Sequence, residues 1–127
     1  MAFNWQGLVL DSQARTTNTA SEVINNTEWK GVTLFVNVTA ASGTGGLVID
    51  FRFHDPITGT SKLVAGGGQA ITATGTYVYQ LYPGVSTGAN AGIYATASLA
   101  LMAQWSVTVT HLDGSSYTYS IGACQHV

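Results

Sequence analysis

The sequence predicts an all-β protein: a single antiparallel β-sandwich, immunoglobulin-like or jelly-roll-like, that occupies residues 1–127. Three observations predict this fold. Apolar and polar residues alternate with a period of two in several short runs. Gly-rich turns separate these runs. Thr, Val, Tyr and Gly recur throughout, whereas Lys and Glu are scarce. A chain of 127 residues that is 46% hydrophobic can bury a sizeable core as one domain.

The N-terminal half contains two strongly alternating runs. Residues 1–12 are expected to form an N-terminal arm or a first strand. The polar run ARTTNTASEVIN, residues 14–25, is expected to be a weak edge strand. Residues 32–39 and 47–54 alternate clearly, and the linker ASGTGG between them is short and rich in glycine. These two runs are therefore expected to pair as a hairpin.

Turn chemistry and a long connection divide the middle of the chain. Residues 55–59, Asp-Pro-Ile-Thr-Gly, have the composition of a tight turn. Residues 76–82 alternate as a further strand. Residues 84–104 form a long connection, and its second half at 90–103 is compatible with a short helix or a long loop. The sequence leaves open whether this connection packs on its own sandwich or contacts a neighbour.

The stretch WSVTVTHLDGSSYTYSIG, residues 105–122, is predicted to be a second hairpin that turns at Asp113-Gly114. His111 ends its first strand, where a half-buried, hydrogen-bonded histidine is expected. A serine-type triad needs an orienting acid and an oxyanion hole. Because turn formation accounts for Asp113, Ser115 and Ser116, no catalytic residue is predicted.

Charge and residue spacing argue against several classes of function. The net charge is −2 with four basic residues, too few for a nucleic-acid-binding or membrane-binding patch. The three histidines lack metal-ligand spacing, and none of the six acids requires a catalytic role. No enzyme activity, metal or cofactor is therefore predicted. Cys124 is the one cysteine, which excludes an internal disulfide, and it is expected to be a small buried side chain.

No Asp, Glu, Lys or Arg occurs from Leu63 to Leu112. A freely diffusing domain normally keeps charge spread over its surface. A span of this length without charge predicts that another chain covers part of the surface. An assembly component is therefore favoured over a diffusing enzyme.

Five phrases carry a resemblance to a known group of proteins. They are ART at 14–16, KGVTLFVNVTAASGTGG at 30–46, FHDPITGTSKLV at 53–64, AITATGTYVYQLYPGV at 70–85 and WSVTVTHLDGSSYTYSIGA at 105–123. Together they resemble small β-sandwich virion proteins of tailed bacteriophages, over most of the chain from about residue 8 to the end. The resemblance implies a head decoration (cement) protein. One departure is that Gln104 and Ser106 flank Trp105, where a basic residue is expected.

The expected function is therefore that of a bacteriophage structural protein that binds the outer head surface and stabilises capsomer junctions. Its expected partners are the major capsid protein and further copies of itself in a homotrimer. It would be made in the host cytoplasm and reside on the virion head. Two alternatives are a tail or head–tail connector component, and a carbohydrate-binding module that uses Trp5 or Trp29. The predicted oligomer or capsid contacts are Phe3, Trp5, Ile93, Tyr94, Leu99, Leu101 and Met102.

Overall fold

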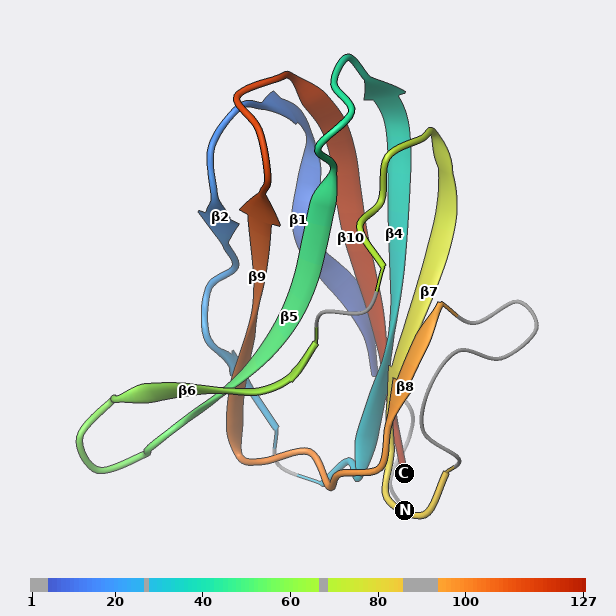
Figure 1. Ribbon diagram of the computed structural model, residues 1–127. Coiled ribbons are helices and arrows are strands. Elements are labelled where there is room, and N and C mark those ends of the chain that lie inside the picture. Colours follow the sequence, from blue (N-terminus) through green and yellow to red (C-terminus); the bar gives the residue numbers. More distant parts are fainter. Residues whose placement is uncertain (1–4, 27, 67–68, 86–93) are drawn as a thin grey trace.

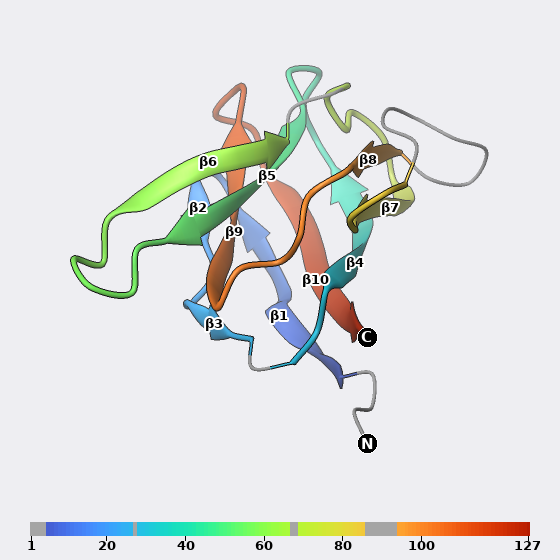
Figure 2. The same cartoon turned by 90° about the horizontal axis from the view of Figure 1, so that it is seen from below.

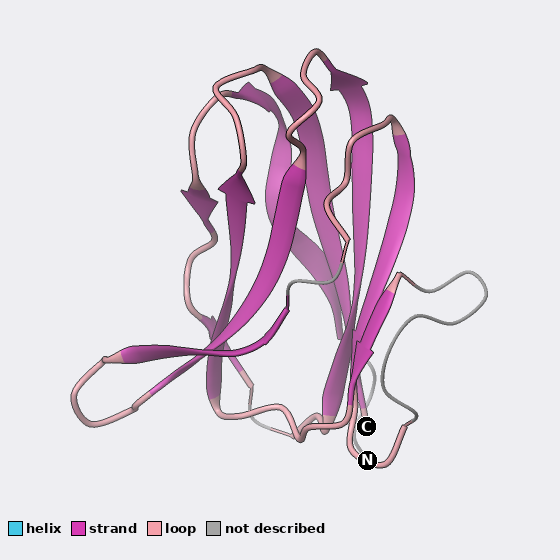
Figure 3. Ribbon diagram, in the orientation of Figure 1, coloured by secondary structure: helices cyan, strands magenta, loops and turns pink. Residues whose placement is uncertain are grey.

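The computed structural model confirms the all-β prediction and describes residues 5–26, 28–66, 69–85 and 94–127. No helix occurs within these ranges, and two sheets pack face to face as a sandwich (Figures 1 and 3). Sheet A contains, in spatial order, β1 (Trp5–Arg15), β10 (Tyr117–His126), β4 (Gly31–Ala41), β7 (Gly75–Leu81) and β8 (Ala95–Ala97). Sheet B contains β2 (Thr19–Ala20), β9 (Gln104–His111), β5 (Leu47–His54) and β6 (Ser61–Gly66), and β3 (Ile24–Asn25) also pairs with β9.

The core lies between the two sheets, because the period-two alternation sends every second side chain inward. Val32, Leu34 and Val36 of β4 are fully buried, and Tyr117, Tyr119 and Ile121 of β10 lie beside them on the same sheet. From sheet B, Leu47, Ile49, Trp105, Val107 and Val109 close the core. The Trp105 indole Nε1 donates to Gln125 Oε1 at 3.0 Å, which satisfies both buried polar groups.

The hairpin expected between residues 32–39 and 47–54 is wrong. β4 pairs with β10 and β7 in sheet A, whereas β5 pairs with β9 and β6 in sheet B. Residues 42–46 therefore cross from one sheet to the other. The alternation predicted which face of each strand is buried, but two strands in facing sheets show the same pattern as two paired strands. A Gly-rich linker can span the distance of about 10 Å between packed sheets as readily as it can close a hairpin.

The C-terminal hairpin is wrong for the same reason. β9 lies in sheet B and β10 lies in sheet A, so residues 112–116 form a second crossing between the sheets. The hairpin that does form is β5–β6, which the Asp-Pro-Ile-Thr-Gly turn closes as predicted. Asp55 Oδ1 accepts a hydrogen bond from the Ile57 N–H at 2.8 Å, and Gly59 has a φ of +76°.

Two further expectations concern the edges of the sandwich. The strand alternative for the N-terminal residues is confirmed from residue 5 onward, because β1 pairs with β10. The polar run at 14–25 ends β1 and then forms the short strands β2 and β3 at the edge of sheet B, which confirms a weak edge strand.

The short helix considered for residues 90–103 is wrong for 94–103, and residues 90–93 lie outside the described ranges. Residues 95–97 form β8, parallel to β7, and the loop that follows is tied to other elements. Its Leu101 N–H donates to Lys30 O at 2.7 Å. This hydrogen bond, that of Asn26 N–H to Ala103 O and the pairing of β8 with β7 outweigh the helix propensity of a segment rich in Ala and Leu, because tertiary contacts commonly override propensity.

Candidate functional site

The two crossings between the sheets meet at one end of the sandwich, in a cluster that we call the closed corner (residues 42–46 and 112–117). Asp113 connects them, because its Oδ2 accepts from Gly45 N–H at 2.7 Å and its Oδ1 accepts from Ser115 N–H at 3.1 Å. The Tyr117 hydroxyl accepts from Gly46 N–H at 2.9 Å and donates to Asp113 Oδ1 at 3.1 Å. These hydrogen bonds, that of Gly45 first, hold the pKa of Asp113 below its ordinary value.

His111 lies next to the closed corner and is half-buried and hydrogen-bonded, as predicted. Its Nε2 lies 3.0 Å from the Tyr119 hydroxyl, and the Arg15 guanidinium lies 4.6 Å from the centre of the Tyr119 ring. Burial lowers the pKa of His111, with Asp113 opposing that shift and Arg15 adding to it. Among the described residues, no hydrogen bond joins His111 to Asp113 or to Ser115. The polar side chains of Asp113, Tyr117 and His111 therefore hold two loops and two sheets together.

The other histidines also have structural partners. His54 Nε2 lies 2.7 Å from Ser106 Oγ, and His126 Nε2 lies 2.7 Å from Thr33 Oγ1. Within the described ranges, no group of three or more His, Cys, Asp or Glu side chains is placed to share a metal ion.

The predicted contact residues are divided among several environments. Phe3 and Ile93 lie outside the described residues, and Trp5 is described only as a backbone position in β1. Tyr94 is half-buried and packs edge-on against the rings of Tyr77 and Tyr79 at centroid distances of 5.1 and 5.7 Å.

Leu99 and Met102 are exposed, as a contact role requires, whereas Leu101 is only 7% exposed and belongs to the core. Leu101 is therefore corrected from a contact residue to a core residue. Tyr94 and Leu101 therefore pack on their own sandwich, whereas Leu99 and Met102 face solvent, and a contact of these two residues with a neighbour stays a prediction.

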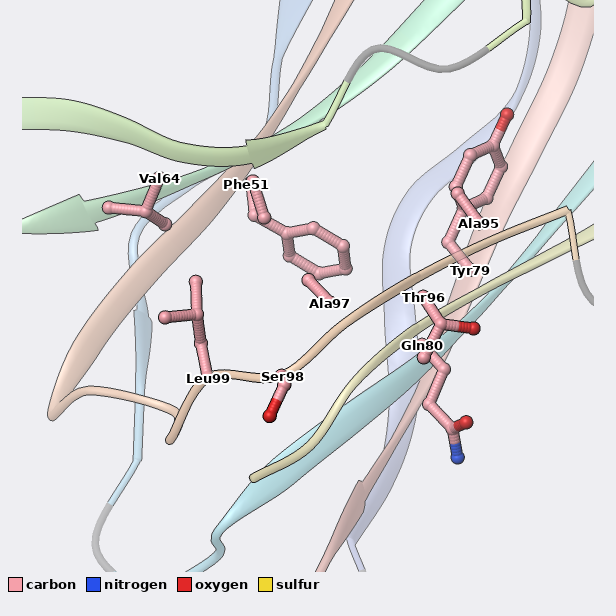
Figure 4. Close-up of a pocket in the computed structure, with 10 residues that line it drawn as sticks. Phe51, Val64, Tyr79, Gln80, Ala95, Thr96, Ala97, Ser98 and Leu99 are labelled. Carbon is pink, nitrogen blue, oxygen red and sulfur yellow. The ribbon is translucent and has the colours of Figure 1, made fainter. Parts of the chain in front are cut away.

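On the side of the sandwich where β6 and β8 approach each other, the two sheets leave a cavity of about 390 Å³ that we call the open side. Its lining is Phe51, Val64, Ala65, Tyr79, Gln80, Ala95, Thr96, Ala97, Ser98 and Leu99. Val64 and Leu99 face each other across it, and the Phe51 ring lies beside them, next to Ala97 (Figure 4). Figure 2, seen from below, shows β6 and β8 on the same side of the molecule.

Both strands at the open side are edge strands. Among the described residues, β6 pairs only with β5 in its sheet, and β8 pairs only with β7. β6 therefore has one row of backbone N–H and C=O groups that pairs with no other strand among the described residues, which is the arrangement that accepts an added strand. Leu63 of β6 is 47% exposed beside this edge.

Part of the uncharged span from Leu63 to Leu112 lines the open side. Every residue that lines the open side, apart from Phe51, falls between Leu63 and Leu112. The sequence identified this region by its absence of charge, although it did not identify Val64, Ala65 or the β6 edge as contact candidates. Two exposed residues of sheet A, Leu8 and Phe35, were also missed, because in a strand they read as ordinary alternation.

No protein-family model, no curated protein and no solved structure matches the chain. The described residues contain no helix long and apolar enough to cross a membrane.

Proposed function

We propose that this chain is a capsid decoration protein of a tailed bacteriophage, which binds the outer head surface through its open side. The resemblance of the five sequence phrases gives the class of protein. The observation that carries the proposal is the open side itself, where two strand edges border an apolar cavity with no charged lining residue.

Such a surface suits a permanent contact with another protein better than it suits catalysis. An extended, uncharged segment of a capsid protein can hydrogen-bond to the edge of β6 and place an apolar side chain against Phe51, Val64 and Leu99. Each bound copy adds buried area at a junction between capsomers, and many copies act together on one particle. The proposed partner is therefore the major capsid protein.

The direct test counts this chain against the major capsid protein in purified virions by quantitative mass spectrometry. A copy number comparable to that of the capsid protein supports decoration. A few copies per particle would contradict decoration and favour a tail or connector component. Absence from the particle would overturn every virion role.

A second test addresses the surface. Leu99→Lys introduces a charge at the rim of the cavity and is expected to weaken binding to undecorated heads by about tenfold or more, because the interface would bury an unpaired charge. Ile57→Lys is the matched control, since Ile57 is 89% exposed at the tip of the β5–β6 hairpin. Equal binding by both variants would place the capsid contact elsewhere on the chain.

A further inference from the structure

The outer face of sheet A offers a second surface, on which the outward residues of β4, β7 and β10 are uncharged and which meets the open side at Gln80. Successive strand residues point to opposite faces, so the residues between the buried ones on β4, β7 and β10 point outward. These outward residues are Thr33, Phe35, Asn37, Thr39, Thr76, Val78, Gln80, Thr118, Ser120, Gly122 and Cys124. None of them is charged. The sequence predicted a small buried side chain for Cys124. Instead, Cys124 lies on this outer face and is half-buried.

One row of residues crosses the middle of this face. The strand registers align Leu8 with Gly122, Gly122 with Phe35, and Phe35 with Val78. Leu8 is 67% exposed and Phe35 is 45% exposed. Between them lies a hollow of about 330 Å³, lined by Gln6, Gly7, Phe35, Gly122, Ala123 and Cys124.

The fold itself does not require glycine at position 122. Gly122 is not among the residues with a left-handed φ, and a Cβ built on it would meet only Gly7 O, at 3.9 Å. Glycine weakens a strand interior and often marks a place where another backbone or a ligand approaches closely. The hollow is thus an open space that any larger residue would fill without disturbing the core.

We propose that two copies of this chain pair through the outer face of sheet A, about a twofold axis that runs along the strands between β4 and β10. β10 and β1 lie on one side of that line and β4 and β7 lie on the other, with the short β8 beyond β7. A twofold rotation therefore reverses the row across the face. Phe35 of each copy comes to lie over Gly122 of the other copy, and Leu8 comes to lie over Val78 of the other copy.

The pairing fits the size and charge of the residues. A large ring meets a hollow at the centre, and two aliphatic side chains meet on either side, so the row is complementary to itself as a closed twofold contact requires. Strands in the two facing sheets run nearly aligned, which is a common way for sheets to pack, at about 10 Å separation. Since the outward residues named above are uncharged, the net charge of −2 does not oppose contact on this face.

The size of the face predicts a weak pairing. Four strands spaced about 4.8 Å apart, each with about seven residues at about 3.3 Å per residue, cover on the order of 400–500 Å² per copy. That area is typical of transient association and below that of a permanent dimer. The dimer is therefore expected to form as concentration rises, and it replaces the threefold association that the phage resemblance implies. The proposal concerns the isolated chain and does not depend on the capsid function.

Sedimentation velocity of the purified chain over about 1–500 µM tests the proposal, since weak interfaces dissociate in this range. We expect a concentration-dependent monomer–dimer equilibrium. Gly122→Val fills the hollow with a good strand former, so it should keep or raise the melting temperature and abolish the dimer. Phe35→Thr should also abolish it, whereas the control Ile57→Thr should leave it unchanged. A purely monomeric chain, a trimer, or a dimer that persists in Gly122→Val would overturn the proposal.

A cross-linking experiment tests the twofold register. In a Cys124→Ser background, Leu8→Cys and Val78→Cys chains are prepared separately and treated with a short bis-maleimide. Leu8 and Val78 lie three strands apart on one copy, roughly 14 Å, but opposite each other between copies. The mixture should form a covalent heterodimer, and neither chain alone should cross-link efficiently. Efficient linkage within either single variant would contradict the axis.

Discussion

The closed corner and the open side show two ways in which the same pair of sheets ends. At the closed corner the two inter-sheet crossings are hydrogen-bonded to each other: Ser42 N–H donates to Ser116 O at 3.0 Å, and Ser116 N–H donates to Ser42 Oγ at 2.9 Å. At the open side, two edge strands border a cavity. The comparison teaches that hydrogen bonds within the chain hold the closed corner together, whereas at the open side the two edge strands border a cavity whose lining residues are uncharged.

The largest expected effect on stability comes from substituting Gly46, which lies in a crossing between the sheets, and Gly59 in a turn provides the comparison. Gly46 has a φ of +90°, and an added Cβ would lie 2.7 Å from Ile71 O, a backbone atom. Gly59, at the β5–β6 turn, has a φ of +76° and nothing within 4 Å. Gly46→Ala should lower the free energy of unfolding by about 3 kcal/mol or more, from strain and overpacking together. Gly59→Ala should cost about 1–2 kcal/mol from strain alone.

Urea unfolding of the two glycine variants measures the difference directly. A larger loss for Gly59→Ala would mean that the closed corner can relax, and the contrast between the two perimeters would be wrong.

A pair of Tyr→Phe substitutions compares the hydroxyl groups of the two regions. The Tyr117 hydroxyl accepts from Gly46 N–H, so Tyr117→Phe leaves a buried donor unpaired and should cost about 1–2 kcal/mol. The Tyr79 hydroxyl beside the open side is buried without a hydrogen-bond partner among the described residues. Tyr79→Phe should therefore be neutral or slightly stabilising.

Thermal or urea unfolding of both tyrosine variants checks this pair. If Tyr79→Phe were the more destabilising of the two, the open side would contain a polar interaction that stabilises the fold.

The sequence predicted individual strands better than their partners. Alternation located the inward residues of β4, β5, β7, β9 and β10, because burial of one face imposes a period of two wherever a strand pairs. It could not separate a hairpin from a crossing, and so both hairpins beside the closed corner were misassigned. The distinction depends on contacts distant in sequence, such as Asp113 with Gly45, which no local pattern contains.

The open side was predicted only in part. The absence of charge from Leu63 to Leu112 predicted that another chain covers part of the surface, which stays a prediction, and most of the cavity lining comes from that span. The individual residues did not follow, because hydrophobicity alone does not separate Leu101, which enters the core, from Leu99 and Met102, which face solvent. The direction of each side chain depends on how the loop is tied to Lys30 and Asn26, which is a tertiary property.

Acid should lower the free energy of unfolding through His111, which lies beside the closed corner. The pKa of His111 is lowered in the fold, so below its ordinary value of 6.5 the unfolded chain binds more protons than the folded chain. The contribution of His111 to the free energy of unfolding should therefore be fully present above about pH 6.5. It should fall as pH decreases toward the lowered pKa. His111→Gln should make the change in stability between pH 7 and pH 5 less steep.

Urea midpoints at several pH values measure the slope for the wild type and His111→Gln. The lowered pKa values of Asp113 and Asp55 act below about pH 4, outside this window. An unchanged slope in the variant would mean that His111 does not carry the acid response.

The smallest expected effect on stability is also the sharpest test of the comparison. Leu63 lies on β6, the edge strand that borders the open side, although it does not line the cavity; it is 47% exposed, and Thr is a good strand former. Leu63→Thr should therefore change the free energy of unfolding by less than about 0.5 kcal/mol. If the variant keeps its stability but binds phage heads less well than Ile57→Thr, the apolar edge acts in contact and not in folding. If it instead loses stability like a core variant, the β6 edge belongs to the fold, and the two perimeters differ less than their hydrogen bonds indicate.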